Sequence, residues 1–303
     1  MRDFRLEVSG AASAHENTFV FLIMSRILII TPKQPSGNPR MRKAADALAK
    51  GGHLVHVLYA YNAEWATQAD VEILSQAKWT WERIGGHPEE AKFNYFLSRL
   101  KRKLAEALGI TQHAMCRGFE DYVARGLSWR PDVVIGHNPG ALGPLVAIGN
   151  KLTIPTLFDA EDYHRGEFAL DSEQSLRVQK LEDECIPQVA AMTAASPLIA
   201  KTYKTLYPQH EVTTINNAFP KKNQPPRPTS ESGPLKIIWF SQVVGLDRGL
   251  KEFLRGMQRA QNVPIQLNVL GLCSEIVKQS LLESASSELH QITLHAPMAE
   301  SAL

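Results

Sequence analysis

Cysteine is scarce in this sequence, which has three among 303 residues, at Cys116, Cys185 and Cys273. No two of them form a Cys-x-x-Cys pair, and an odd number cannot all be paired. A disulfide framework or a structural zinc site is therefore not expected. This usage is typical of proteins from a reducing compartment, and it predicts a cytoplasmic protein.

Long apolar runs are also missing, since none approaches the roughly 18 residues that a membrane-spanning helix requires. The apolar run at residues 19–24 is too short for a signal peptide and lacks the small residues of a cleavage site. MSRILIITP follows directly, and its Met24 is a natural start. Residues 1–23 are therefore interpreted as a non-native or disordered extension.

An excess of charge of one sign is absent, because the net charge is +2 and charged residues make up 21% of the chain. Nucleic-acid-binding proteins usually concentrate far more basic charge, so we expect no nucleic-acid partner. With 303 residues, 44% of them hydrophobic, the chain can bury a sizeable core and form two ordinary domains.

Three signature motifs of nucleotide-binding and hydrolytic enzymes are missing. The loop after the first expected strand, PKQPSGNPR, has one glycine and several prolines, so the GxGxxG fingerprint of nicotinamide enzymes is absent. Neither a GxxxxGK[ST] phosphate loop nor a GxSxG nucleophile elbow occurs. A nicotinamide, P-loop or α/β-hydrolase enzyme is therefore not favoured.

The sequence does contain a repeated alternation of strand and helix patterns. RILIIT (26–31) is followed by a loop, by alanines and leucines at helical spacing over 39–50, and by HLVHVLYA (53–60). Residues 62–130 are interpreted as helical. Further strands are expected at 131–136, 155–162, 189–196 and 211–216. This order predicts an α/β fold with a doubly wound, mostly parallel sheet.

Residues 218–234 carry five prolines with Ser, Lys and Gly, a composition typical of an interdomain linker. A second alternation follows, with strands expected at 235–241, 265–271 and 292–297. The predicted layout is an N-terminal Rossmann-like domain over 24–217, the linker, and a second domain over 235–303. Three strands are few for a doubly wound domain, so the second is interpreted as partial.

Residues 92–108 show an amphipathic helical pattern with an apolar stripe at steps of three and four. The stripe consists of Phe93, Phe96, Leu97, Leu100, Leu104 and Leu108, and basic charge surrounds it at Lys92, Arg99, Lys101, Arg102 and Lys103. Two interpretations stay open. One is an ordinary packed helix with a solvated basic face, and the other is peripheral contact with an anionic membrane surface.

In open parallel sheets, ligands bind beyond the carboxyl ends of the strands. The candidate site residues are therefore those that lie near the carboxyl ends of the expected strands or follow them. They are Ser36, Gly37, Asn38, Arg40, His137, Asn138, Asp159, Glu161, His164, Gln242, Arg248 and Gly249.

Four segments resemble, in one consistent order, the retaining glycosyltransferases of the GT-B fold that use nucleoside-diphosphate sugars (glycosyltransferase family 4). They begin with SRILIITPKQPSGNPR, PDVVIGHNPG, AAMTAASPLIAKTY and LKIIWFSQVVGLDRGLKEFL. The resemblance implies two Rossmann-like domains and transfer of a sugar to an acceptor, such as a cell-envelope glycan or a lipid-linked one. It also implies a sugar nucleotide in place of a cofactor, and no obligatory metal. The sequence accordingly has no Asp-x-Asp pair.

By the resemblance, His164 is the catalytic candidate near the donor sugar. Arg248 stands where the family has a diphosphate-binding Lys, beside Gly249, and Gln242 replaces the family's Arg. Acceptor contacts fall to residues 36–40, His137 and Asn138, while Asp159 and Glu161 orient hydroxyls or cap a turn.

Purely structural roles stay open for several of these residues. Arg248 can be a solvated residue of a helix's first turn. His164 can be a surface-loop residue bonded to Glu161 or Asp162. Gly37 can supply a positive φ in a turn, and Asn38 can cap the helix at 39–50.

The resemblance places the paired glutamates (E-x7-E) of the family's donor domain later in the second domain than the given sequence reaches, and Glu300, near its end, has no partner. The chain is therefore interpreted as C-terminally truncated, which puts its catalysis in question. Two alternative functions follow: a non-catalytic fragment that only binds, and a sugar-nucleotide epimerase on the same scaffold.

Overall fold

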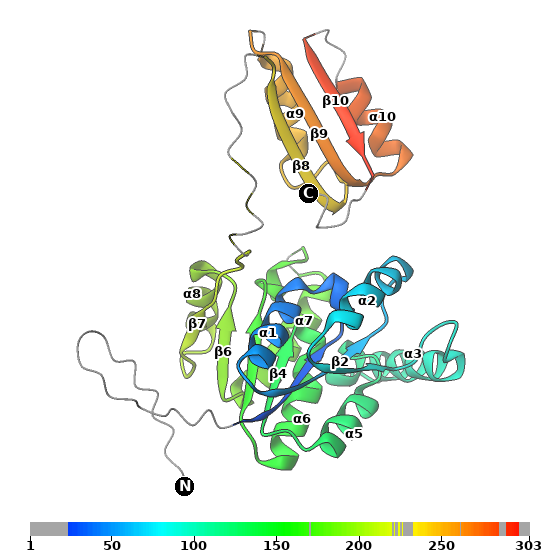
Figure 1. The fold of residues 1–303 in the computed structure, drawn as a ribbon, viewed down its shortest axis with the longest axis vertical. Coiled ribbons are helices and arrows are strands. Elements are labelled where there is room, and N and C mark those ends of the chain that lie inside the picture. The colour runs from blue at the N-terminus through cyan, green and yellow to red at the C-terminus, as the bar shows by residue number, and fades with distance from the viewer. Residues whose placement is uncertain are drawn as a thin grey trace, which may run out of the picture. The chain divides into compact units, whose positions relative to one another are not determined.

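The computed structural model describes residues 24–169, 171–219, 221, 224, 226, 233–260, 262–284 and 289–296. The chain divides into two compact units, Met1–Phe219 and Pro220–Leu303 (Figure 1). The predicted extension at 1–23 and most of the predicted linker at 218–234 lie outside the described residues. Among the described residues, no helix is both long enough and apolar enough to cross a bilayer.

The larger unit contains a seven-stranded sheet with the order β3-β2-β1-β4-β5-β6-β7. Every neighbouring pair is parallel, and β1 pairs Ile29 with Val57 of β2 and with Ile135 of β4. The predicted α/β class with a parallel sheet is thus confirmed. The strands are β1 Arg26–Thr31, β2 Leu54–Ala60, β3 Thr80–Ile84, β4 Val133–His137, β5 Thr156–Ala160, β6 Ala191–Ala194 and β7 Val212–Thr214.

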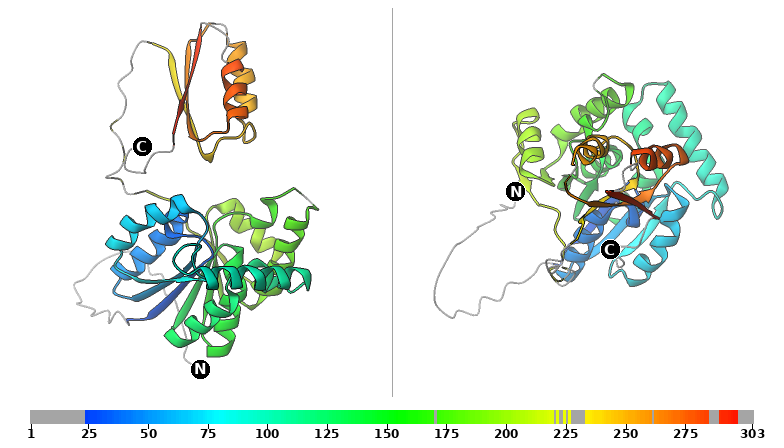
Figure 2. Two further views of the ribbon diagram at one scale, coloured as in Figure 1. Left: turned by 90° about the vertical axis from the view of Figure 1, so that its right-hand side faces the viewer. Right: turned by 90° about the horizontal axis from the view of Figure 1, so that it is seen from above.

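Helices connect these strands and cover both faces of the sheet (Figure 2). Leu28 and Ile30 of β1 pack with residues of α5 to α8, whereas Ile27 and Ile29 pack with residues of α1 and α2. Burial on both faces explains why the middle of β1, from Ile27 to Ile30, is apolar without interruption. The helices are α1 Pro39–Lys50, α2 Glu64–Gln76, α3 Lys92–Ala107, α4 Thr111–Met115, α5 Phe119–Trp129, α6 Leu142–Leu152, α7 Glu173–Cys185 and α8 Pro197–Leu206.

The interpretation of residues 62–130 as helical throughout was wrong, because β3 interrupts the helices and pairs with β2 at the sheet edge. Ile84 is the one buried residue of β3, so the strand lacks the apolar run that marks its central neighbours. The strand is held by backbone pairing and by the neighbouring Trp79. That ring is buried, and its Nε1 donates to Asp46 at 2.8 Å.

The smaller unit contains a three-stranded parallel sheet of order β10-β9-β8 within the described residues. Leu250, Leu254 and Met257 of the first helix pack on Leu267 and Val269 of the central strand. The elements are β8 Leu235–Val243, α9 Leu250–Arg259, β9 Ile265–Leu272, α10 Glu275–Ser284 and β10 His290–His295.

A close backbone approach at Gly271 predicts a sensitive position in this unit. A Cβ there would lie 2.1 Å from the Ser241 carbonyl oxygen, and φ is +146°. Gly271→Ala is expected to destabilise the smaller unit by about 2–3 kcal/mol, because strain and overpacking act together. Hydrogen exchange of peptides from β8 and β9 should accelerate, while peptides from β1 keep their protection.

The matched control for Gly271 is Gly256→Ala in α9. A Cβ at Gly256 meets nothing within 4 Å. This replacement should leave exchange unchanged or slow it, since alanine favours a helix over glycine by up to about 1 kcal/mol. Equal effects of the two variants would contradict the steric argument.

Candidate active site

The strand order reverses at β1, which lies between β2 and β4. In doubly wound sheets this switch point opens a crevice at the carboxyl ends of the strands, where ligands bind. Asn38, after β1, donates from Nδ2 to Oδ1 of Asn138, after β4, at 3.1 Å. Asn138 has a φ of +65°, a conformation that non-glycine residues adopt mainly where the surroundings enforce it. Two predicted site residues therefore meet at the switch point.

Asn38 has a second role that the sequence also suggested, because it caps α1. Its Oδ1 accepts from the Met41 amide at 3.0 Å, and Pro39 occupies the first helical position. Gly37 ends the short 3-10 helix Pro35–Gly37 and is not among the residues with positive φ. The suggestion of a positive φ at Gly37 was therefore wrong.

Arg40 forms a buried, bidentate ion pair with Asp159 at the end of β5. Nε and Nη2 of Arg40 lie 2.5 and 2.7 Å from the two carboxylate oxygens, and Nη1 donates to the Ile215 carbonyl at 2.6 Å. Thr193 of β6 also donates to Asp159. The pair thus ties α1 to the carboxyl ends of β5, β6 and β7.

His137 lies between two carboxylates, with Nδ1 at 3.2 Å from both Asp159 Oδ2 and Glu161 Oε1. Burial lowers the pKa of His137, but its hydrogen bonds to the two carboxylates outweigh burial and raise it. Burial raises the pKa of Asp159, yet its bonds to His137 and Arg40 hold it well below the ordinary value. The pKa of Glu161 is likewise lowered, by His137 and Asn138 against burial.

These carboxylates cap no turn, because their oxygens bind side chains. Glu161 accepts from His137 and, at 3.0 Å, from Nδ2 of Asn138. His137, Asp159 and Glu161 could together offer three ligands to a metal ion. Arg40 already neutralises Asp159, and Nδ1 of His137 faces both carboxylates. The arrangement therefore suits a proton on Nδ1 of His137 that is shared with the two carboxylates. Arg40 and protonated His137 are then two cations facing the two anions Asp159 and Glu161.

His164 lies outside this network, in the 3-10 helix His164–Gly166 after β5. Its Nδ1 is 2.5 Å from Oε1 of Glu167, and its backbone amide donates to the Tyr203 hydroxyl at 3.4 Å. The residue is 2% exposed. The structural alternative, a surface histidine bonded to Glu161 or Asp162, was therefore wrong in both burial and partner.

Both site histidines carry a buried Nε2 atom with no hydrogen-bond partner. A buried polar atom without a partner costs about 1–3 kcal/mol, and such atoms often mark a catalytic group or an ordered water. His137 and His164 thus each hold one unused polar atom near the carboxyl edge of the sheet.

A second buried network supports the His164 segment and was not recognised in the sequence. Glu182 is fully buried in α7, and accepts from the Tyr203 hydroxyl and from Nε of Arg165, each at 2.6 Å. Burial raises the pKa of Glu182 despite these bonds. In the sequence LEDEC, nothing distinguishes this glutamate from its exposed neighbours.

Other candidates near the switch point face elsewhere. Ser36 turns toward α2, where its amide donates to Asp70 at 2.7 Å and its hydroxyl to the Ala66 carbonyl at 3.1 Å. Lys33 was overlooked, although it follows β1 directly. It is exposed, and its charge contributes to the lowered pKa values of Glu161 and Glu167.

The three donor-side candidates lie together in the smaller unit, at the carboxyl end of β8. Gln242 is exposed at a register irregularity between Phe240 and Val243. Arg248 precedes α9 rather than belonging to its first turn, and its Nη1 lies 3.5 Å from the Ser241 hydroxyl. Arg248 and Gly249 both have positive φ, +56° and +83°. The turn thus presents an exposed guanidinium beside the start of a helix.

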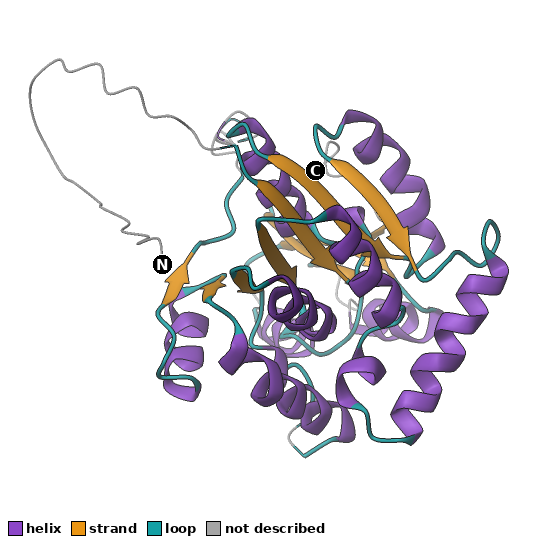
Figure 3. Ribbon diagram, turned by 90° about the horizontal axis from the view of Figure 1, so that it is seen from below, coloured by secondary structure: helices purple, strands orange, loops and turns teal. Residues whose placement is uncertain are grey.

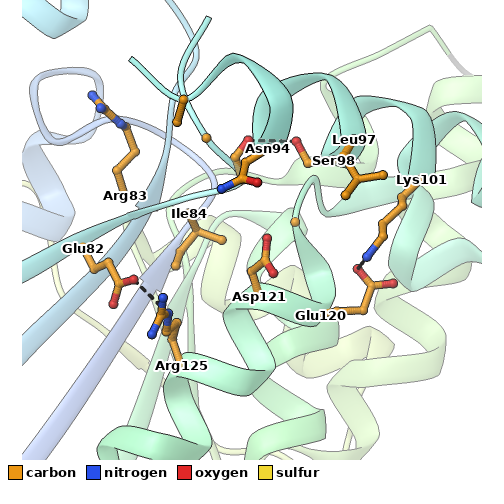
Figure 4. A pocket seen from close by; sticks show the side chains of 14 residues that line it. Glu82, Arg83, Ile84, Asn94, Leu97, Ser98, Lys101, Glu120, Asp121 and Arg125 are labelled. Atoms are coloured by element: carbon orange, nitrogen blue, oxygen red, sulfur yellow. Dashed lines mark hydrogen bonds and ion pairs between the residues drawn. The ribbon is translucent and has the colours of Figure 1, made fainter. Parts of the chain in front are cut away.

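A cavity of about 360 Å³ lies elsewhere in the larger unit, between β3, α3 and α5 (Figure 4). Its walls carry the ion pairs Arg125–Glu82 at 2.9 Å and Lys101–Glu120 at 3.8 Å. None of the predicted site residues lines it. Position at the switch point, rather than cavity size, therefore identifies the candidate site.

No protein-family model matches the chain, and no curated protein matches it either. Several solved structures do match the chain. Sucrose-phosphate synthase from Thermosynechococcus elongatus aligns with a TM-score of 0.59 at 14% identity, over 92% of this chain and 72% of that one. HepE from Anabaena, in complex with UDP-glucose, aligns with a TM-score of 0.59 at 11% identity, over 91% and 70%.

The galactosyltransferase WaaB of the lipopolysaccharide outer core is a third such structure. It aligns with a TM-score of 0.56 at 12% identity, over 90% of this chain and 68% of that one. At these identities the likeness concerns the fold. The parallel sheets of seven and three strands match those of the neighbours, and this chain has the GT-B fold of the nucleotide-sugar glycosyltransferases.

Proposed function

We propose that this protein transfers a sugar from a nucleoside-diphosphate sugar to an acceptor, with retention of the anomeric configuration. The observation that carries the proposal is the polar network at the switch point. There Asn38, Arg40, His137, Asn138 and Glu161 converge from three strand ends. A fold shared with GT-B glycosyltransferases, together with a polar site where the strand order reverses, supports glycosyl transfer.

In this proposal the switch-point network of the larger unit holds the acceptor. Amide and carboxylate groups held in fixed geometry suit sugar hydroxyls, which both donate and accept hydrogen bonds. Asp159 and Glu161 are held ionised by His137 and Arg40, so they act as acceptors. Ser36 and Gly37 are assigned a minor part, because Ser36 faces α2 and Gly37 has no side chain.

The donor diphosphate is assigned to the turn after β8 in the smaller unit. The Arg248 guanidinium offers charge and two-point hydrogen bonding to phosphate, and Gln242 offers neutral donors. Gly249, as the N-cap of α9, lets the backbone approach a ligand closely. Two structures with this fold, HepE and Arabidopsis UGT89C1, hold UDP-glucose and UDP-L-rhamnose respectively.

His164 is assigned the catalytic contact with the reacting sugar. Its bond to the Glu167 carboxylate places a proton on Nδ1 and fixes the ring, which leaves Nε2 for the ligand. The donor's charge is met by Arg248 and backbone amides, so the proposal includes neither a cofactor nor an obligatory metal. Retention rests on the sequence resemblance, and the anomeric configuration of the product tests it.

Titration calorimetry with UDP- and GDP-sugars tests the donor assignment. Wild-type protein should bind one of them, with the same affinity in the presence of EDTA. Arg248→Met should weaken binding about 10- to 100-fold, because a hydrogen bond to a charged group contributes roughly 1.5–3 kcal/mol. Arg255→Met, an exposed arginine on α9, is the matched control and should bind as wild type does.

The outcomes of this titration separate the alternatives. Absence of binding at millimolar nucleotide would contradict the transferase and favour a binding fragment. Binding followed by release of an epimer or free sugar, with no acceptor present, would favour an epimerase. Equal nucleotide affinity of the Arg248 and Arg255 variants would contradict the assignment of the diphosphate to the turn after β8.

A further inference from the structure

Helix α3 is packed on the larger unit through its small residues. Ser98 and Ala105, seven positions apart, are its two buried residues. The Ser98 hydroxyl donates to the Gly85 carbonyl at 2.8 Å, and Nη1 of Arg117 donates to the same carbonyl at 2.5 Å. Helix α3 also contacts α4. A narrow seam of small side chains thus fixes α3 to the protein.

The large apolar side chains of α3 lie on a different face of the helix and are exposed. At roughly 3.6 residues per turn, the centre of the stripe falls about a third of a turn away from Ser98 and Ala105. Phe93 is 77% exposed and Leu108, just past the helix end, 73%. Phe96, Leu97, Leu100 and Leu104 are exposed as well. Their arrangement is the reverse of an ordinary surface helix, whose apolar face points inward.

Helix α3, which carries this exposed stripe, lies at the margin of the larger unit in two perpendicular views. Figure 1 shows α3 beyond α2 and α5, and Figure 3 shows it as the long helix at the right. A contiguous apolar face of this kind on a folded domain marks an interaction site. Of the two interpretations drawn from the sequence, the packed helix was wrong about the apolar stripe.

Basic residues flank the exposed stripe. Lys92, Arg99 and Lys103 follow one flank, Lys101 follows the other, and Arg102 is exposed as well. The one acidic residue of the helix, Glu106, pairs with Arg177 of α7. This face of α3 therefore combines large exposed apolar side chains with a rim of positive charge.

We infer that α3 docks this protein on an anionic lipid surface, with the six apolar side chains at the acyl boundary and the basic flank at the headgroups. Charge complementarity favours this occupant. A second copy would bring an identical positive rim against the first, so self-association through this face is opposed by like charge. The inference does not depend on sugar transfer.

Vesicle flotation with the full chain tests the inference. The protein should bind vesicles of phosphatidylcholine mixed with phosphatidylglycerol, bind phosphatidylcholine alone far less, and dissociate as salt rises. Leu104→Ser with Leu108→Ser should lower partitioning at least about tenfold. The matched control is Leu198→Ser with Leu206→Ser, which removes two exposed leucines of α8 and should not change binding.

A second pair of variants tests the charge. Lys92→Gln with Lys103→Gln should lower partitioning about tenfold or more, since each basic residue near the surface favours binding roughly fivefold. Lys151→Gln with Lys201→Gln changes the net charge equally on α6 and α8 and should have little effect.

Three results would overturn the inference. They are equal binding to neutral and anionic vesicles, unchanged binding by the α3 variants, and dimerisation that the leucine variants of α3 abolish in the absence of vesicles. All exchanged side chains are exposed, so circular dichroism should show the wild-type fold in every variant.

Discussion

Arg40→Met is expected to destabilise the larger unit by about 3–5 kcal/mol, because it leaves the Asp159 carboxylate buried without its bidentate guanidinium partner. The side chains of the pair are 10% and 6% exposed, so water cannot replace the guanidinium. Urea unfolding followed by tryptophan fluorescence measures the change, since four of the five tryptophans belong to this unit.

The effect of Arg40→Met should depend on pH in a defined direction. The lowered pKa of Asp159 in the folded protein stabilises the fold above the ordinary value of 3.8, and this contribution disappears as pH falls through the folded-state pKa. The difference between wild type and variant should therefore shrink in acid. Arg40→Met combined with Asp159→Asn should recover part of the loss.

Arg102→Met is the control for Arg40, because it removes an exposed arginine of α3. Its effect should stay within about 0.5 kcal/mol. An Arg40→Met variant as stable as this control would show that the ion pair contributes nothing to the fold.

His164→Ala is expected to lower kcat for release of the nucleoside diphosphate on the order of 10²- to 10³-fold, if the proposed transfer holds. The loss is that of one preorganised polar contact with the reacting group. Donor affinity should change little, because the diphosphate is assigned to Arg248. The measurement is turnover of whichever sugar nucleotide binds in calorimetry.

His53→Ala is the matched control for His164. His53 precedes β2 at the amino edge of the sheet, where its Nδ1 accepts from the Ser25 amide at 3.3 Å. The His53→Ala variant should have the same kcat as the wild-type protein. An His164→Ala variant that retains more than about a third of wild-type kcat would be incompatible with catalysis by this residue.

The residues of the switch-point network show which features of the site can be predicted from the sequence and which cannot. Position at the carboxyl end of a parallel strand, or just after it, is enough to select Arg40, His137, Asn138, Asp159 and Glu161, because all these strands end at one edge. It cannot say which of them bind one another. The Arg40–Asp159 pair joins residues 119 positions apart, and no local sequence pattern indicates such a partner.

Burial was the second feature that the local sequence could not supply. Glu182 reads as a surface residue of a charged helix, yet it lies fully buried under the His164 segment. The edge strand β3 was missed for the opposite reason, since its exposed residues carry no apolar run. Likewise, Leu97, Leu100 and Leu104 have the spacing of a core-facing stripe but face solvent.

The sequence by itself determined the succession of strands and helices apart from β3, the parallel α/β class and the strand-end candidates, because these follow from periodicity, capping and loop chemistry over short distances. The tertiary structure alone decided the reversal of strand order at β1, the charge network around His137, and the outward face of α3. Those depend on contacts between distant segments and on which side of an element is covered, and neither is encoded in any single stretch of the chain.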